Sequence, residues 1–275
     1  MRITLLGTRG SVGRAGPETV RYGGDTSAVE VQADDGTVLL LDAGSGVVHA
    51  SPTVASAPVH VVLTHLHMDH IQGLGFLNPL FNPDVEVHIW GPESSGRSLA
   101  ARLGRYLSPP LFPVHLRDLP NLTLHEIGAE TNSIGPFSVT SDFIIHPGRT
   151  LGFRVAADGR RLAYLPDHEP ALGGEHLTAE PGWTSGFGLA EGVDVLIHDT
   201  QYTDEEYRSR VGWGHSTLTH AADFATMTGA GRLVMFHHEP AHTDELIDQL
   251  MYELRRDRDL PFELVPGLAG AVIDV

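Results

Sequence analysis

The sequence predicts a single α/β domain, with β-sheet in the interior and helices outside. Short apolar runs rich in β-branched residues recur between Gly, Asp and Pro turn signals, which is typical of strands. Helical patterns are fewer, and no linker, low-complexity tract or short repeat divides the 275 residues. We therefore treat residues 1–275 as one domain.

The first half of the chain alternates strands with turns, and one helix is expected at Ser95–Leu107. Three prolines within Ser108–Pro113 predict a loop. The apolar runs predict strands at Arg2–Leu6, Ala28–Val31, Thr37–Leu41, Val59–Thr64 and Val85–Trp90.

The second half adds more strands and two longer helices. Asp158-Gly159 predicts a hairpin turn, and Gly and polar residues predict a long surface loop at Pro170–Gly192. Helices are expected at Thr217–Thr228, with Ser216 as N-cap, and at Thr243–Arg256. Strands are expected at Phe137–Ile145, Leu151–Ala156, Arg161–Leu165, Asp194–His198, Arg232–Phe236, Phe262–Val265 and Ala271–Val275.

Composition excludes several classes of chemistry. The chain has no Cys, which excludes disulfides, thiolate zinc sites, iron–sulfur clusters and a cysteine nucleophile. Every basic residue is Arg, so a Schiff-base lysine and a P-loop lysine are also excluded. A chain with 41% hydrophobic and 19% charged residues is expected to be globular.

The formal net charge of −17 predicts repulsion of polyanions such as duplex DNA or tRNA. A nucleic-acid polymer is therefore not expected as a partner. Met1–Leu6 lacks the layout of a signal peptide, and there is no run of 18 apolar residues. We expect a cytoplasmic protein without a membrane partner.

The strongest chemical signal follows the strand expected at residues 59–64. His65, His67, Asp69 and His70 lie within six residues. Side chains alternate in extended chain, so His65 and His67 point the same way, and Asp69 and His70 turn toward a neighbouring point as a helix begins. Imidazole and carboxylate ligands suit zinc, manganese or iron. The alternative is a polar loop with incidental histidines. It is weaker because clustered histidines would not stabilise such a loop when neutral and would repel one another when protonated.

Metal-capable side chains also stand at the ends of later strands. His146 and Asp167 each follow an expected strand, and His237 and His238 follow another. Each residue alone is weak evidence, because a single strand-end His or Asp is more often structural. Together with the residue 65–70 cluster they form a candidate ligand set.

These residues resemble the metallo-β-lactamase superfamily, whose His-x-His-x-Asp-His motif stands here as His65, His67, Asp69 and His70. The resemblance implies a four-layer αββα sandwich with two divalent metal ions, zinc first and manganese or iron as alternatives, at one edge of the sheets. A homodimer is common in the family. The implied ligands are His65, His67 and His146 for one metal, Asp69, His70 and His237 for the other, and Asp167 as the bridge. His238 is the alternative to His237.

A second resemblance narrows the branch of the family. Gly212–Thr217 is similar to the Gly-His-Ser-Thr segment of ribonuclease Z and related phosphodiesterases, in which the His pairs with an acid. The matching pair is His215 and Asp199, where the ribonuclease usually has Glu. An imidazole held by Asp199 keeps its proton more readily and could donate it to a leaving alkoxide. Alternatively, His215 only helps to cap the helix that follows. Asp42 matches an early Asp of the family and is expected to orient a ligand histidine.

The Gly-rich loop Gly7–Gly24 carries local positive charge, because residues 1–24 hold four Arg and one Glu, a sum of +3. Backbone N–H groups and Arg side chains in such loops bind phosphate oxygens, so Arg9 and Arg14 are expected to contact substrate. His168 and Glu169 could reach the pocket from beside Asp167, but they are left out of the candidate site. Ser108–Val114 and Pro170–Gly192 are expected to wall a small pocket.

These observations predict a dinuclear metal-dependent hydrolase, most simply a phosphodiesterase that acts on a small or cyclic phosphate ester. A metal-bridging hydroxide is the expected nucleophile, Asp69 could accept the proton of the water, and His215 is the expected general acid. The long basic or Gly-rich arm with which ribonuclease Z grips tRNA is not found, so tRNA processing is not expected. The alternatives are a lactone, ester or thioester hydrolase on the same metals, and a non-catalytic metal- or ligand-binding module.

Overall fold

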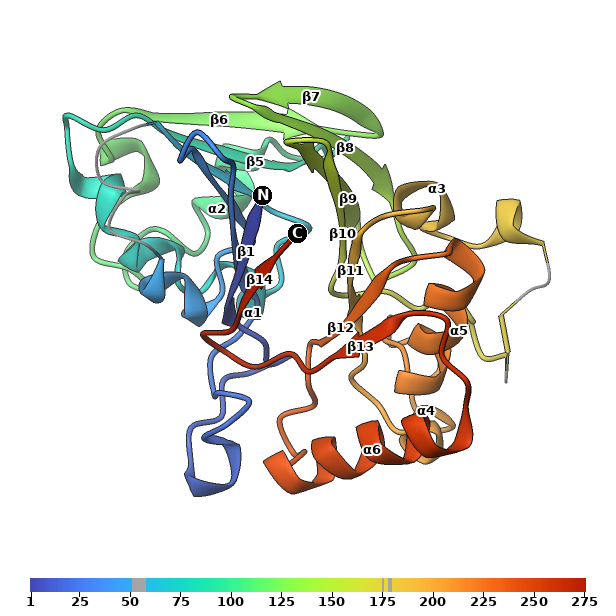
Figure 1. The fold of residues 1–275 in the computed structure, drawn as a ribbon. Coiled ribbons are helices and arrows are strands. Elements are labelled where there is room, and N and C mark those ends of the chain that lie inside the picture. The colour runs from blue at the N-terminus through green and yellow to red at the C-terminus, as the bar shows by residue number, and fades with distance from the viewer. Residues whose placement is uncertain (51–57, 175, 178–179) are drawn as a thin grey trace.

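Two seven-stranded sheets pack face to face in the computed structural model, with helices on their outer faces (Figure 1). The structure describes residues 1–50, 58–174, 176–177 and 180–275. The strand order is β14-β1-β2-β3-β4-β5-β6 in the first sheet and β13-β12-β11-β10-β9-β8-β7 in the second. This arrangement confirms the predicted α/β sandwich.

The first sheet takes most of its strands from the first half of the chain. Its β1, β2 and β3 pair antiparallel, and β3 to β6 pair parallel. Its strands are β1 (Arg2–Gly7), β2 (Ala28–Gln32), β3 (Val38–Leu41), β4 (Val59–Val62), β5 (Val87–Pro92), β6 (Leu122–Ile127) and β14 (Val272–Asp274).

In the second sheet, β7 to β10 pair antiparallel and β10 to β13 pair parallel. Its strands are β7 (Glu130–Ile134), β8 (Phe137–Phe143), β9 (Leu151–Ala157), β10 (Arg160–Leu165), β11 (Val195–Asp199), β12 (Arg232–Phe236) and β13 (Glu263–Val265). The α-helices are α1 (Met68–Ile71), α2 (Leu99–Leu103), α3 (Phe187–Ala190), α4 (Asp204–Tyr207), α5 (Leu218–Thr228) and α6 (Asp244–Asp257).

Burial on both faces explains why the central strands are continuous apolar runs rather than alternating ones. In β3, Leu39 and Leu41 belong to the core between the sheets, whereas Val38 and Leu40 pack in the outer core with the segments around α1 and α2. A third core lies between the second sheet and α3, α5 and α6. Each sheet is therefore fixed on two sides.

The sequence missed β6 and β7, whose side chains are largely half-buried or exposed and therefore carry little apolar signal. It also overextended the helix expected at Ser95–Leu107, because α2 forms only over Leu99–Leu103, with Ser98 as its N-cap. The helix cap expected at Ser216 is wrong. Thr217 caps α5, and the Ser216 hydroxyl donates to the carbonyl oxygen of His168 instead.

Part of the long loop expected at Pro170–Gly192 contains α3, and its positions 175, 178 and 179 lie outside the described residues. Among the helices that the structure describes, none combines the length and the apolar character needed to cross a bilayer.

Three histidines and a tryptophan form a stack on the inner face of β4, β5 and β6. His60 is in register with Leu39 of the inter-sheet core, and His88 lies opposite His60 on the next strand. The His60 and His88 rings stack at 4.8 Å, His88 Nδ1 lies 3.1 Å from His125 Nε2, and His125 stacks on Trp90 at 3.8 Å. Burial, followed by the neighbouring His88 and His125, lowers the pKa of His60 to about 4.

The stack predicts acid sensitivity of the fold. An unfolded histidine has a pKa of about 6.5, so between pH 6.5 and 4 the unfolded chain binds a proton that folded His60 refuses, and stability falls as the pH falls. Replacing His60 with Phe should keep a stacked ring and flatten this dependence, by up to about 1.4 kcal/mol per pH unit for one proton. Urea denaturation across this pH range measures the slope.

The matched control is His49→Phe, because His49 is 59% exposed and faces Asp25 rather than other histidines. If the two variants show the same slope as the unchanged protein, the stack is not the origin of the acid sensitivity.

Candidate metal centre

The candidate ligands lie beyond the ends of strands that belong to both sheets. The segment His65–His70 follows β4 of the first sheet, whereas His146, Asp167 and His237 follow β8, β10 and β12 of the second. The strands β10, β11 and β12 run parallel, so their carboxyl ends meet at one edge of the second sheet. The two sheets bring residues far apart in the chain to the same place.

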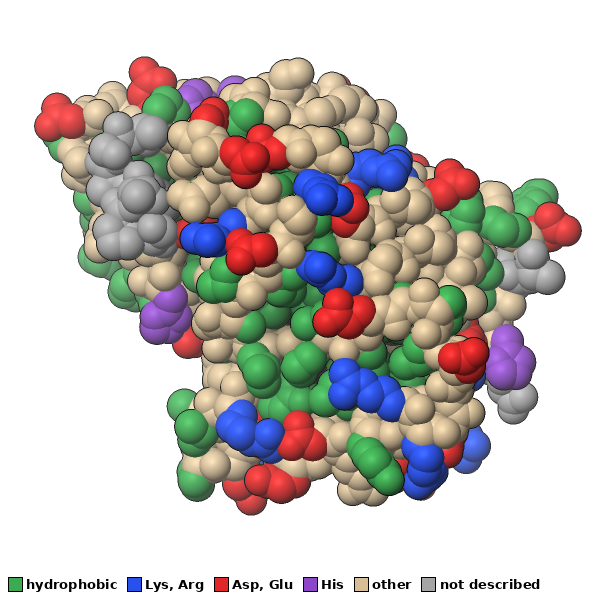
Figure 2. Space-filling view, in the orientation of Figure 1, with side chains coloured by type: hydrophobic (Ala, Val, Ile, Leu, Met, Phe, Trp, Pro, Cys, Tyr) green, Lys and Arg blue, Asp and Glu red, His purple; other side chains and the backbone are tan. Residues whose placement is uncertain are grey.

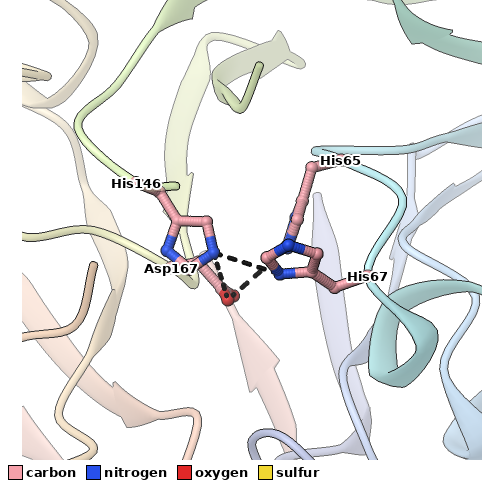
Figure 3. Close-up of side chains that lie close together, drawn as sticks. All are labelled: His65, His67, His146 and Asp167. Carbon is pink, nitrogen blue, oxygen red and sulfur yellow. Dashed lines mark hydrogen bonds and ion pairs between the residues drawn. The ribbon is translucent and has the colours of Figure 1, made fainter. Parts of the chain in front are cut away.

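The first cluster comprises His65, His67, His146 and Asp167, whose ligand atoms all lie within 4.8 Å of one another (Figure 3). Asp167 Oδ2 lies 3.7 Å from His65 Nε2 and 3.6 Å from His146 Nε2. His146 Nε2 lies 3.2 Å from His67 Nδ1. These donors face a common point from three loops.

The second cluster comprises Asp69, His70, Asp167 and His237, within the same 4.8 Å limit. Asp167 Oδ1 lies 2.9 Å from His70 Nε2 and 3.3 Å from His237 Nε2. Asp69 Oδ2 lies 3.2 Å from His237 Nε2. Asp167 is thus common to both clusters, one carboxylate oxygen facing each.

The chemistry of these donors fits divalent cations. His65 Nε2 is buried and has no hydrogen-bond partner, although it lies among the nitrogen and oxygen atoms of the cluster that could bind a metal. Burial, reinforced by His70, lowers the pKa of His65, and burial lowers that of His146 to about 4, so both imidazoles favour the neutral form that binds metal. The two buried carboxylates, Asp69 and Asp167, supply negative charge that a cation would balance.

His70 is oriented by Asp42, as the sequence comparison implied. His70 Nδ1 lies 2.8 Å from Asp42 Oδ2, which leaves Nε2 toward the second cluster. The backbone N–H of Thr64 donates to Asp42 Oδ1 at 2.8 Å, and the Tyr164 hydroxyl donates to Oδ2 at 3.0 Å. A carboxylate held in this way fixes the tautomer and the rotation of a metal-binding imidazole.

His237, rather than its neighbour His238, enters the second cluster. Its Nδ1 lies 2.9 Å from Gln201 Oε1, which leaves Nε2 toward Asp69. His238 is turned away: its Nε2 lies 3.0 Å from the carbonyl oxygen of Gly267, and its ring contacts Tyr22 edge-on. The left-handed φ of 60° at His237 separates the two side chains.

His215 and Asp199 form a buried pair beside the second cluster. Asp199 Oδ2 lies 2.7 Å from His215 Nδ1, and the His215 ring stacks on His237 at 4.9 Å. Burial lowers the pKa of His215, but Asp199 outweighs it and raises the pKa to about 9. Asp199 thus engages Nδ1 of His215 and leaves Nε2 as the second ring nitrogen.

Two glycines allow the backbone to approach candidate ligand histidines closely. A Cβ on Gly10 would lie 2.4 Å from Nδ1 of His237, and one on Gly214 would lie 2.3 Å from Nδ1 of His146. Gly214 also has a φ of +89°, which disfavours any side chain, and its carbonyl oxygen lies 2.8 Å from His146 Nδ1. The first glycine belongs to the loop Gly7–Gly24, which therefore supports the site with backbone.

The expectation that Arg9 contacts substrate is wrong. Its side chain is fully buried, and it donates to the carbonyl oxygens of Gly23, Glu239 and His242. Three carbonyl contacts make Arg9 a structural side chain that ties the N-terminal loop to the segment after β12. Arg14 is half-exposed and donates to the carbonyl oxygen of Pro240 at 3.0 Å.

Sequence reasoning missed the residues that orient the candidate ligands. Gln201 holds His237, Tyr164 holds Asp42, and the backbone N–H of Ser11 donates to Asp69 Oδ2 at 2.8 Å. Glu169, which the sequence analysis left out, is buried and bonded to the loop that carries His215. Only the sequence position of Glu169 beside Asp167 could have pointed to it.

Comparisons with known proteins identify the family of the chain. A family model described as "Beta-lactamase superfamily domain" matches residues 37–238. A relative named "Ribonuclease Z" from Myxococcus xanthus is 26% identical, with 96% of this chain and 95% of the relative covered.

Solved structures share the fold over the whole chain. The metallo-beta-lactamase fold protein YhfI from Bacillus subtilis superposes with a TM-score of 0.72 at 20% identity, covering 99% of both chains. The short form of human tRNase Z superposes with a TM-score of 0.68 at 22% identity, covering 100% of this chain and 99% of the other.

These relatives contradict the expectation that a nucleic-acid polymer is excluded as a partner, because ribonuclease Z enzymes are among the proteins that the chain resembles over nearly its full length. The net charge of −17 is a sum over the chain and does not fix the potential at each surface. On the face shown in Figure 2, Arg side chains lie among Asp and Glu side chains.

Replacing Gly214 with Ala should displace His146. The added Cβ would clash with the imidazole, and the alanine would have an unfavourable φ. We therefore expect a lower melting temperature and less bound metal per chain, measured by inductively coupled plasma mass spectrometry after zinc loading. The control is Gly212→Ala, since Gly212 has a similar φ of +84° but open space around its Cβ position. That variant should lose about 1–2 kcal/mol of stability through backbone strain and keep its metal. Equal metal loss in both variants would contradict the assignment.

Proposed function

Because the chain belongs to the beta-lactamase superfamily, we propose that it is a metal-dependent hydrolase of phosphodiester bonds. The observation that carries the proposal is the juxtaposition of the two ligand clusters with the His215–Asp199 pair. The clusters account for activation of water, and the pair accounts for protonation of a poor leaving group. Both promote cleavage of a P–O bond to an alcohol.

The proposed ligands divide into two sets that share Asp167. His65, His67 and His146 would hold one cation, and Asp69, His70 and His237 the other. Divalent cations bound there act as Lewis acids and lower the pKa of water toward about 7. Zinc suits this set of imidazoles and carboxylates, and manganese and iron suit it as well.

Asp69 is better suited to binding and orienting than to storing a proton. Burial raises its pKa, but His70 and His237 outweigh that effect and hold the pKa below the usual range. A carboxylate that remains ionised can accept a hydrogen bond from water without taking the proton. The N–H of Ser11 fixes one of its oxygens.

His215 is the proposed general acid. Asp199 accepts from Nδ1, the backbone N–H of Ser216 donates to the other Asp199 oxygen at 3.2 Å, and Gln201 N–H donates to the same oxygen at 2.9 Å. The imidazolium is thus fixed in orientation, and Nε2–H is free to protonate the departing oxygen. Arg14, which lies in the N-terminal loop, is the residue proposed to contact a phosphate oxygen of the substrate.

A small or cyclic phosphodiester is the first substrate class to test. A phosphodiester within a structured RNA is the second, favoured by the relatives named ribonuclease Z. Steady-state assays with bis-p-nitrophenyl phosphate, a panel of cyclic nucleotides and a precursor tRNA separate the two. A lactone panel run in parallel tests the ester-hydrolase alternative, and hydrolysis of lactones alone would overturn the phosphodiester assignment.

The double substitution His65→Ala/His67→Ala should abolish hydrolysis of bis-p-nitrophenyl phosphate, because it removes two of the ligands proposed for one cation. Chelation of the unchanged protein should do the same, and added zinc or manganese should restore activity to the chelated protein but not to the variant. The matched control is His49→Ala/His176→Ala, two histidines that are 59% and 77% exposed. Full activity in the ligand variant would refute metal-dependent catalysis.

Replacing His215 with Ala should reduce kcat about 10²- to 10⁴-fold on diesters that release an alkoxide, because a positioned acid contributes about that much. The loss should be much smaller on bis-p-nitrophenyl phosphate, since p-nitrophenolate leaves without protonation. An equal loss on the two kinds of substrate would show that His215 acts in some other way.

A further inference from the structure

Glu169 is a buried carboxylate that none of the proposed catalytic steps uses. Its side chain is 1% exposed, and it follows Asp167 by two residues in the chain. Its Oε1 accepts from the Tyr207 hydroxyl at 2.8 Å and from the backbone N–H of Gly212 at 2.8 Å. Its Oε2 accepts from the backbone N–H of Gly214 at 2.7 Å. A buried carboxylate with three donors is a strong local constraint.

The segment that Glu169 holds is directly linked to both halves of the candidate site. The Gly214 carbonyl oxygen lies 2.8 Å from Nδ1 of the ligand His146, and the next residue is His215. Gly212 and Gly214 both have left-handed φ values and lack a side chain to restrain them. Trp213 between them is 59% exposed and is not held by the core. The Glu169 carboxylate therefore supplies a restraint that these residues lack.

We propose that Glu169 is a positioning residue for the proposed general acid, which it aligns by fixing the backbone of Gly212 and Gly214. This inference rests on the proposed function. The carboxylate sets where His215 leaves the loop, and through the Gly214 carbonyl it sets the rotation of His146. Displacing a catalytic group by about 1 Å can cost on the order of 100-fold in rate, so a small movement of this loop is sufficient to matter.

Glu169→Gln tests the contact with little change in shape. The amide keeps one oxygen, which can still accept from Tyr207 and Gly212, but its NH₂ group then faces the Gly214 N–H donor to donor. In that orientation Gly214 is released, and in the flipped orientation Gly212 and Tyr207 are released instead. The matched control is Glu205→Gln, which removes the same charge from an exposed position on α4.

Two measurements distinguish positioning from a merely structural role. Hydrogen exchange by NMR reports the amides of Gly212 and Gly214 directly, without reference to activity. In Glu169→Gln, one or both should exchange at least about tenfold faster than in the Glu205→Gln control, as expected for a broken buried hydrogen bond. The ratio of kcat on a cyclic nucleotide to kcat on bis-p-nitrophenyl phosphate should fall about tenfold or more.

His215→Ala separates failure of this inference from failure of the proposed function. If His215→Ala lowers that ratio and Glu169→Gln does not, the positioning role is overturned while the acid assignment stands. If neither lowers it, the acid assignment itself fails. Should Glu169→Gln not fold, Tyr207→Phe decides the question, because it removes a single donor to the same carboxylate. A faster Gly212 amide and a lowered ratio in that variant would support positioning, and unchanged values would overturn it.

Discussion

The Asp167 carboxylate joins the two halves of the candidate metal centre. It is buried between four histidines, of which His65 and His70 follow a strand of the first sheet and His146 and His237 follow strands of the second. A buried charge is tolerated only where opposite charge or hydrogen bonds compensate it. The two sheets must therefore meet at this edge with the loops that carry these histidines aligned, and the apolar core between the sheets sets their separation.

Several features with unfavourable local energies are retained around this carboxylate. Asp42 and His237 are non-glycine residues with left-handed φ values of 59° and 60°. Each such conformation costs about 1 kcal/mol or more, and it persists where surrounding contacts fix it. Asp42 is fixed by Thr64 and Tyr164, and His237 by Gln201. The orientation of the candidate ligand atoms thus depends on backbone conformation as well as on side-chain type.

Much of this arrangement could be predicted from the sequence, and the reason is local. The residue 65–70 motif carries four metal-capable side chains in one turn, and the remaining ligands stand after strands with clear apolar runs. The strands β6 and β7 were not predicted because most of their side chains are half-buried or exposed. The roles of Arg9, Gln201 and Glu169 depend on partners more than 30 residues away, and no local pattern records such contacts. The inference from net charge failed because a sum over the chain carries no spatial information.

The topology determines when, during synthesis, the residues of the candidate metal centre can come together. His70 contacts His237, which lies 167 residues later in the chain. The first strand, β1, pairs with the last, β14, and places Arg2 opposite Asp274. During synthesis, the histidine-rich turn would leave the ribosome long before the residues that complete its ligand set. Contacts so distant in sequence slow folding, because the entropic cost of closing a long loop is incurred before the stabilising contacts form. A nascent chain of this protein would therefore present a partial cation-binding motif well before it could act as an enzyme.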